Sequence, residues 1–156
     1  MRADVLALDL PMSVAAPGLA RRAVEELDLG AGERESATLI ISELVTNAVL
    51  HSGAAVTTSI RITARIIGDM LRLSVTDGGT WAGAIRRREP AGIEGGFGFL
   101  LVERLVARWG VERNGTTTVW CELPVDNRSR AEAAADRQSE PHPRLKTSLQ
   151  SRVPSA

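Results

Sequence analysis

The chain has 156 residues, 44% of them hydrophobic and 24% charged, and its 19 basic residues balance its 19 acidic residues. This length suits one domain with one hydrophobic core. A formal net charge of zero gives no general attraction to nucleic acid or to an anionic membrane, so neither is expected as a direct partner.

Residue types that mark particular compartments and sites are scarce. Cys121 is the only cysteine and cannot form an internal disulfide. No apolar run reaches the roughly 20 residues of a membrane helix, and the N-terminus lacks a signal-peptide pattern, so a cytoplasmic protein is expected. Lys146 is the only lysine, which excludes a P-loop and the strand lysine of eukaryotic-type kinases.

The first predicted elements are a strand and a helix. Leu6, Leu8 and Leu10 alternate with smaller or polar residues before Pro11, which predicts a short strand at a sheet edge. A helix that ends before Gly30 is then predicted, because apolar residues recur at helical spacing. These residues are Leu19, Ala23, Val24 and Leu27.

A longer helix is predicted over residues 31–51, with an apolar stripe that should cover a sheet. The stripe consists of Ala37, Ile40, Ile41, Leu44 and Ala48. Two runs of alternating apolar residues follow, at 56–66 and 71–75, and predict two strands. Gly68-Asp69 lies between them and suits a type II′ or type I′ hairpin turn.

The last predicted elements are a loop over residues 80–94, a helix and a hairpin. The helix starts near Gly98 and is expected to bury Leu101, Val102, Leu105, Val106 and Trp109. The hairpin pairs Gly110–Asn114 with Thr117–Leu123 and turns at Asn114-Gly115. This order predicts an α+β fold: a two-layer sandwich in which helices cover one face of a mixed, mainly antiparallel sheet.

From residue 126 to residue 156 the composition is polar and mixed in charge, with few large apolar residues. Such a segment cannot offset its ordering entropy by burial, so a disordered tail is predicted after a folded domain at 1–125. A docking segment that folds on a partner is the alternative.

Three polar residues fall on one face of the longer predicted helix. Glu43, Asn47 and His51 are spaced by four and drift only about 40° per step. They flank the apolar stripe, where a cleft could open. Considered alone, the three residues also fit an ordinary solvated helix face.

Asp77 shares its predicted strand face with Leu71, Leu73 and Val75, so the period of two points its carboxylate toward the buried side. A buried carboxylate needs a partner, and an N–H donor on a ligand is one candidate. Gly78-Gly79 would let a flat ring approach the backbone. The same three residues also fit a simple turn.

Glycines precede the third predicted helix at Gly95, Gly96 and Gly98. Free backbone N–H groups and the helix dipole favour an anion such as phosphate at this position.

In this order, ELVTNAVLH, VTDGG, GGFGFLLVERLVARWG and GTTTVW resemble the motifs of the GHKL or Bergerat class of ATP-binding domains, a histidine kinase-like ATPase fold. The resemblance covers most of residues 17–125. It is closest to the anti-sigma factor serine/threonine kinases and related single-domain regulatory ATPases of actinobacteria.

The resemblance implies ATP and Mg²⁺ as ligands. It assigns magnesium coordination to Asn47 and the role of general base to Glu43. Asp77 would accept a hydrogen bond from the adenine amino group, and Gly79 would make room beside the base. The remaining implied contacts are the phosphate lid at Gly95, Gly96 and Gly98 and a hydroxyl at the adenine end from Thr118.

The sequence departs from the family pattern at Trp81, where a glycine would be expected. This residue is expected to pack onto the protein rather than over the nucleotide. The run Arg86–Arg88 fits a solvated charge run and, less simply, a contact to phosphates or an acidic partner. We expect His51 to have a structural role and Cys121 to be a small buried residue.

The function that the resemblance implies is phosphorylation of a serine or threonine on a small antagonist (anti-anti-sigma) protein, with a sigma factor as a further partner. A binding module that uses ATP only to select its partner is the alternative. The resemblance also suggests a homodimer formed through the N-terminal strand and first helix.

Overall fold

The computed structural model describes residues 5–51, 59–79 and 97–126, together with Ala131 and Ala135. Three helices and five strands occur in these ranges, in the order β1 (Val5–Pro11), α1 (Ala16–Glu25), α2 (Ala31–His51), β2 (Ser59–Ile67), β3 (Met70–Asp77), α3 (Phe97–Leu105), β4 (Arg108–Arg113) and β5 (Thr117–Pro124).

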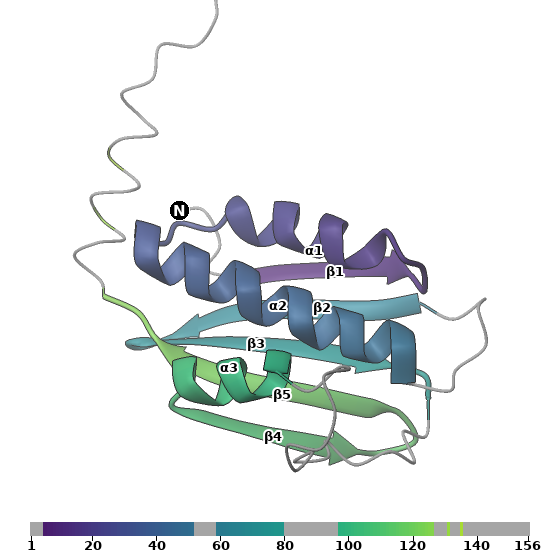
Figure 1. Cartoon of the computed structure of the whole chain (residues 1–156). Coiled ribbons are helices and arrows are strands. Elements are labelled where there is room, and N and C mark those ends of the chain that lie inside the picture. The colour runs from purple at the N-terminus through teal and green to yellow at the C-terminus, as the bar shows by residue number, and fades with distance from the viewer. Residues whose placement is uncertain (1–4, 52–58, 80–96, 127–130, 132–134, 136–156) are drawn as a thin grey trace, which may run out of the picture.

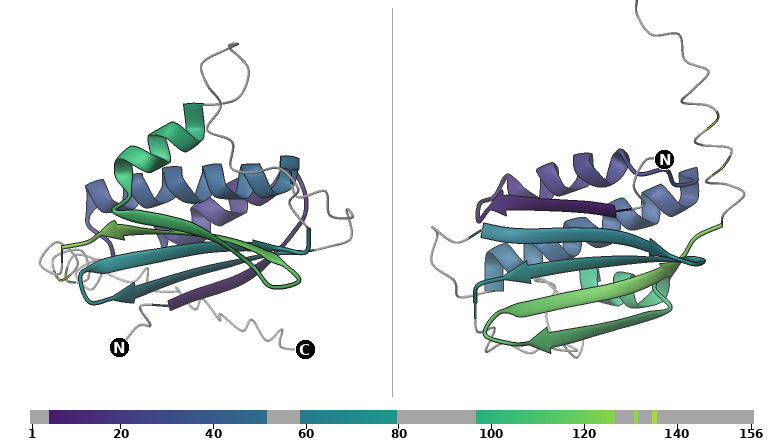
Figure 2. Two further views of the ribbon diagram at one scale, coloured as in Figure 1. Left: turned by 90° about the horizontal axis from the view of Figure 1, so that it is seen from below. Right: turned by 180° about the vertical axis from the view of Figure 1, so that it is seen from behind.

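The strands form one sheet in the order β1-β2-β3-β5-β4, and the four pairings are all antiparallel. The three helices lie on one face of this sheet (Figure 1), and the view from behind shows the other face without a helix among the described residues (Figure 2). The two-layer α+β prediction is therefore confirmed, and β1 is an edge strand as expected.

The core lies between the sheet and the helices. The stripe predicted on α2 is buried, with exposed fractions of 4% or less, and it packs over buried residues of the strands. The strand residues are Ile60, Ile62, Ala64, Leu71, Leu73, Val75, Val119, Cys121 and Leu123. Burial raises the pKa of the Cys121 thiol to about 12, which fits the expected role as a small apolar residue.

Glycines with positive φ form both hairpin turns. Gly68 has a φ of 63°, and no described residue other than glycine has a positive φ, so the β2–β3 turn is type II′ and not type I′. Gly115 has a φ of 77° in the three-residue connection between β4 and β5.

The N-terminus of α2 is tied to the end of β5 through one side chain. The Gly30 N–H donates to Oε2 of Glu33 at 2.9 Å, as in a capping box, and the Asp126 N–H donates to Oε1 of the same carboxylate. Val125, the residue after β5, is also buried. The predicted tail lies almost entirely outside the described residues; Ala131 and Ala135 within it are helical and exposed.

Two predicted burial patterns are partly wrong, although Val24, Leu27 and Val102 are buried as expected. In α1 the buried residues are Ala16, Ala20 and Val24, while Leu19 is 37% exposed. The third helix ends at Leu105, Leu101 is 42% exposed, and Trp109 lies in β4 with 37% exposure. The last hairpin accordingly begins at Arg108, two residues earlier than predicted.

Candidate functional site

The candidate site begins with a buried carboxylate at the end of β3. Leu71, Leu73, Val75 and Asp77 alternate with less buried residues along this strand, so Asp77 points toward the helices. It is 4% exposed. The sequence prediction of a carboxylate on the buried side is therefore confirmed.

Two contacts hold the chain just after Asp77. The Gly79 N–H donates to Oδ1 of Asp77 at 2.7 Å, which closes a short turn through the aspartate side chain. The Thr117 hydroxyl donates to the Gly79 carbonyl oxygen at 3.0 Å. Thr117 is 1% exposed and is the cross-strand partner of Asp77 in β5. The turn and the buried carboxylate, which the sequence left as alternatives, occur together.

The electrostatics of Asp77 favour a donor from outside the fold. Burial raises the pKa of its carboxyl group, and the hydrogen bond from Gly79 lowers that pKa by less. The ionised carboxylate is thus under-stabilised in its buried position. A ligand N–H placed against it would supply the missing hydrogen bond.

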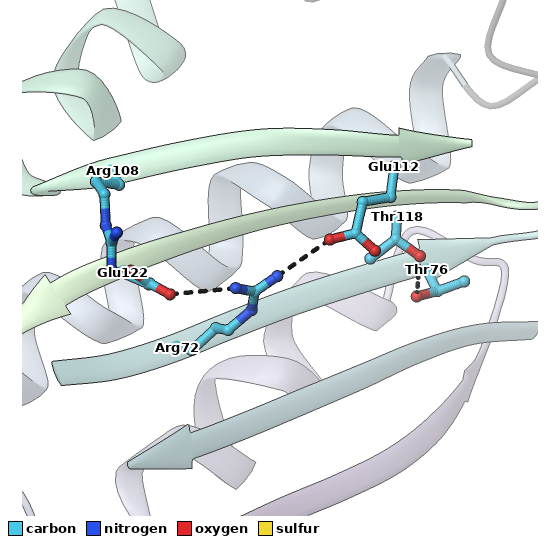
Figure 3. Close-up of polar contacts among 6 residues, drawn as sticks. All are labelled: Arg72, Thr76, Arg108, Glu112, Thr118 and Glu122. Atoms are coloured by element: carbon cyan, nitrogen blue, oxygen red, sulfur yellow. Dashed lines mark hydrogen bonds and ion pairs between the residues drawn. The ribbon is translucent and has the colours of Figure 1, made fainter. Parts of the chain in front are cut away.

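Thr118 lies on the opposite face of the sheet, which corrects the prediction from sequence. Its Oγ1 is 2.8 Å from Oγ1 of Thr76, on the face without helices (Figure 3). Adjacent residues of a strand point to opposite faces, so Thr118 cannot share a pocket with Asp77. Thr117 is the hydroxyl on the helix side.

Glu43 and Asn47 lie on the flank of α2 that faces away from α1. The Ser42 hydroxyl accepts a hydrogen bond from Arg21 of α1 at 2.8 Å, which fixes the α1 side of the helix. A helix turns by about 100° per residue, so Glu43 lies on the other flank of the apolar stripe from Ser42. Asn47 lies about one turn further along that flank. Both side chains are half-buried. This is the flank toward α3, which also packs on α2 (Figure 1).

The C-terminus of α2 and the C-terminus of β3 lie at the same end of the molecule. β2 starts near the C-terminus of α2 and runs antiparallel to β3, so β3 ends, at Asp77, near the start of β2 (Figure 1). The fold therefore brings the carboxylate of Asp77 and the polar flank of α2 to one end of the helix layer. The side chain of His51, the last residue of α2, lies outside the described residues.

Only part of the predicted phosphate segment can be placed. Gly98 falls in the first turn of α3, whose leading N–H groups have no partner within the helix. Gly95, Gly96, Trp81 and Arg86–Arg88 lie outside the described residues.

These residues fit Mg-ATP in their chemistry. Asp77 offers a buried acceptor for an amino group, next to a glycine that leaves space for a flat ring. Asn47 offers a hard oxygen ligand of the kind that Mg²⁺ takes, usually one or two from protein beside phosphate and water oxygens. Glu43 offers a carboxylate that could accept a proton.

Comparison with known proteins identifies the class of domain. The family model of the histidine kinase-like ATPase domain matches residues 10–122. The chain belongs to this family, whose fold implies ATP binding. Comparison with curated proteins gives no match.

The solved structures that the chain matches include a blue-light activated histidine kinase from Erythrobacter litoralis EL346. Its histidine kinase domain has 22% sequence identity and a TM-score of 0.49, over 77% of this chain and 64% of that one. A longer structure of the same kinase has the same identity and TM-score, over 71% of this chain and 41% of that one. The chain thus spans less than two thirds of either structure.

No described helix is long and apolar enough to cross a membrane.

Sequence reasoning missed Thr117, although a signal for it was present. Leu123, Cys121 and Val119 alternate as apolar residues in β5, and one further step of the same period reaches Thr117. Extending that alternation would have selected this threonine over its neighbour.

Proposed function

We propose that this protein binds Mg-ATP on the helix side of the sheet, with the adenine amino group donating to Asp77. The observation that carries the proposal is the buried Asp77 carboxylate, whose turn is anchored to Thr117 through Gly79. Family membership supports the nucleotide. The phosphates would extend toward Asn47, Glu43 and the N-terminus of α3.

We further propose that the protein is a serine/threonine kinase of the anti-sigma factor type, acting in the cytoplasm on a small antagonist protein. A sigma factor is its second proposed partner. Bound Mg²⁺ would neutralise charge on the transferred phosphoryl group. Asn47 would hold the metal. Glu43 would accept the proton of the substrate hydroxyl as its oxygen bonds to the γ-phosphorus, while the bond from that phosphorus to the bridging oxygen breaks and ADP leaves.

The nucleotide site is tested by thermal unfolding with and without Mg-ATP. A ligand at about 100 times its dissociation constant stabilises the folded state by about 2.7 kcal/mol. We expect this stabilisation in the parent protein and its loss in Asp77→Asn. The same shift in unfolding temperature in both proteins would show that Asp77 does not contribute to ATP binding. No shift at millimolar ATP would reject the proposed nucleotide site.

Phosphoryl transfer is tested with γ-labelled ATP and purified antagonist proteins of the anti-anti-sigma class. We expect label on a serine or threonine, lost in Glu43→Gln while ATP binding is kept. Glu35→Gln is the matched control, because Glu35 is an exposed carboxylate on the same helix. ATP binding without transfer to any of the proteins would favour the binding module, and normal transfer by Glu43→Gln would reject Glu43 as the base.

A further inference from the structure

The two edges of the sheet differ in how well they suit pairing with another strand. β1 forms one edge and ends at Pro11, which has no N–H to donate. β4 forms the other edge, and within the described residues no strand pairs with its outer side. Its sequence RWGVER contains no proline. An edge of this kind is a template for a further strand.

The β4 sequence is complementary to itself in one antiparallel register. With Gly110 on a two-fold axis, Arg108 lies opposite Glu112 of a second copy, and Trp109 lies opposite Val111 of that copy. The interface between the two copies then contains two ion pairs and two apolar pairs. A shift of the axis to between Gly110 and Val111 would instead place Arg108 opposite Arg113, where like charges repel.

The charged side chains of this register are already held in place. Arg108 forms an ion pair with Glu122 at 2.6 Å, and Glu112 forms one with Arg72 at 3.2 Å (Figure 3). Both nevertheless keep much of their side chain in solvent, 71% for Arg108 and 53% for Glu112. Each can therefore accept a second partner at little cost in conformational entropy.

No side chain of β4 lies at the centre of the register, because Gly110 is on the axis. The Trp120 ring covers Gly110, so a Cβ atom at this position would lie 2.6 Å from a ring carbon. Two glycines can meet on the axis with only backbone between them. On the helix side, pairing would cover Trp109, which is 37% exposed, and the half-buried Val111.

We propose that a second copy of this chain pairs with the outer edge of β4, antiparallel and with Gly110 on the two-fold axis, and so joins the two five-stranded sheets. This surface is remote in the sheet order from β1, the edge that the family resemblance suggested. The proposal does not depend on the proposed nucleotide function. A strand of six residues buries little area, so the dimer is weak and depends on protein concentration.

Sedimentation velocity tests the register through charge reversal, from about 1 μM to about 1 mM protein, where small interfaces associate. We expect Arg108→Glu and Glu112→Arg to be monomers when measured separately, because each variant places like charges opposite each other across the axis. An equimolar mixture of the two variants should dimerise, because both charge pairs between the two different chains again join opposite charges. The double variant should dimerise by itself for the same reason.

Arg65→Glu is the matched control, since this exposed arginine lies in β2, which β3 and β5 separate from β4. It should dimerise like the parent protein. Rescue in the mixture cannot arise from the lost contacts to Glu122 or Arg72, because those contacts lie within one chain. Parent protein that stays monomeric at the highest concentration, single variants that still dimerise, or a mixture that stays monomeric would each overturn the proposal.

Discussion

The two faces of β3 and β5 show how one residue step along a strand changes what a side chain does. On the helix side, Leu71, Leu73 and Val75 are buried in the core, and Asp77 ends the same row as a candidate ligand group. On the open side, Arg72 forms an ion pair with Glu122, and Thr76 forms a hydrogen bond with Thr118. The members of this second row are Arg72, Ser74, Thr76, Thr118, Trp120 and Glu122.

The difference is sharpest at the end of β3. Asp77 and Thr117 form a buried cross-strand pair beside Gly79, whereas Thr76 and Thr118 bond to each other on the open face. Both pairs are one residue apart in the same two strands. Residue type does not distinguish the roles of Thr117 and Thr118, but the face of the sheet on which each lies does.

The largest expected contrast is in stability. Leu73→Ala removes a fully buried side chain and should lower the free energy of unfolding by about 2–5 kcal/mol. Ser74→Ala, one residue away on the open face, should change it by less than about 0.5 kcal/mol. Urea denaturation of both variants measures this, and equal losses would contradict the assigned faces.

Asp77→Asn should separate ligand binding from stability. Burial raises the pKa of Asp77 in the folded state above its ordinary value of 3.8. The stabilising effect of its protonation is then complete below pH 3.8 and is lost as pH rises through the folded-state pKa. At pH 7 the variant without ligand should therefore melt above the parent protein, and this advantage should shrink as the pH falls toward 4.

The same variant should lose its response to Mg-ATP, because the amide group would replace the charged acceptor. Asp69→Asn, in the exposed β2–β3 turn, is the control and should leave both properties unchanged. The prediction is contradicted if Asp77→Asn melts below the parent protein at pH 7 and this difference shrinks at acid pH. That result would show that the fold stabilises the ionised carboxylate of Asp77.

Arg72→Met tests the open face and should have a smaller effect than Leu73→Ala. The Arg72 guanidinium bonds Glu112 and Glu122 and lies 4.1 Å from the centroid of the Trp120 ring. Because the arginine side chain is 32% exposed, its loss should cost about 1 kcal/mol, and less at high salt. Arg65→Met is the control without these contacts. A cost that is independent of salt would assign the effect to packing on Trp120.

Periodicity alone predicted the elements that carry strong apolar patterns. The stripe on α2 and the two hairpins were clear because their apolar spacing and turn glycines agree. The burial of Asp77 followed from the same period of two. These features depend on local sequence, which is why the fold class could be inferred without a structure.

The errors occur where tertiary packing overrides local pattern. In α1 the buried face consists of Ala16, Ala20 and Val24, and the weak hydrophobic signal of the two alanines was outweighed by Leu19. Trp109 continued the apolar pattern of α3, but the chain leaves the helix after Leu105 to form the edge of the sheet. Thr118 was assigned from the family motif, without reference to the face of β5 on which it lies.

The most direct test of the central claim is a calorimetric titration of Mg-ATP into Thr117→Val and Thr118→Val. Both changes replace a hydroxyl with a methyl group at neighbouring positions of β5. We expect Thr117→Val to weaken ATP binding by about tenfold or more, which corresponds to about 1.4 kcal/mol. The reason is that the Gly79 carbonyl oxygen loses its hydrogen bond from Thr117 beside Asp77. Thr118→Val should bind ATP like the parent protein. The reverse pattern, with binding lost only in Thr118→Val, would contradict the assignment of the adenine site to the helix side of the sheet.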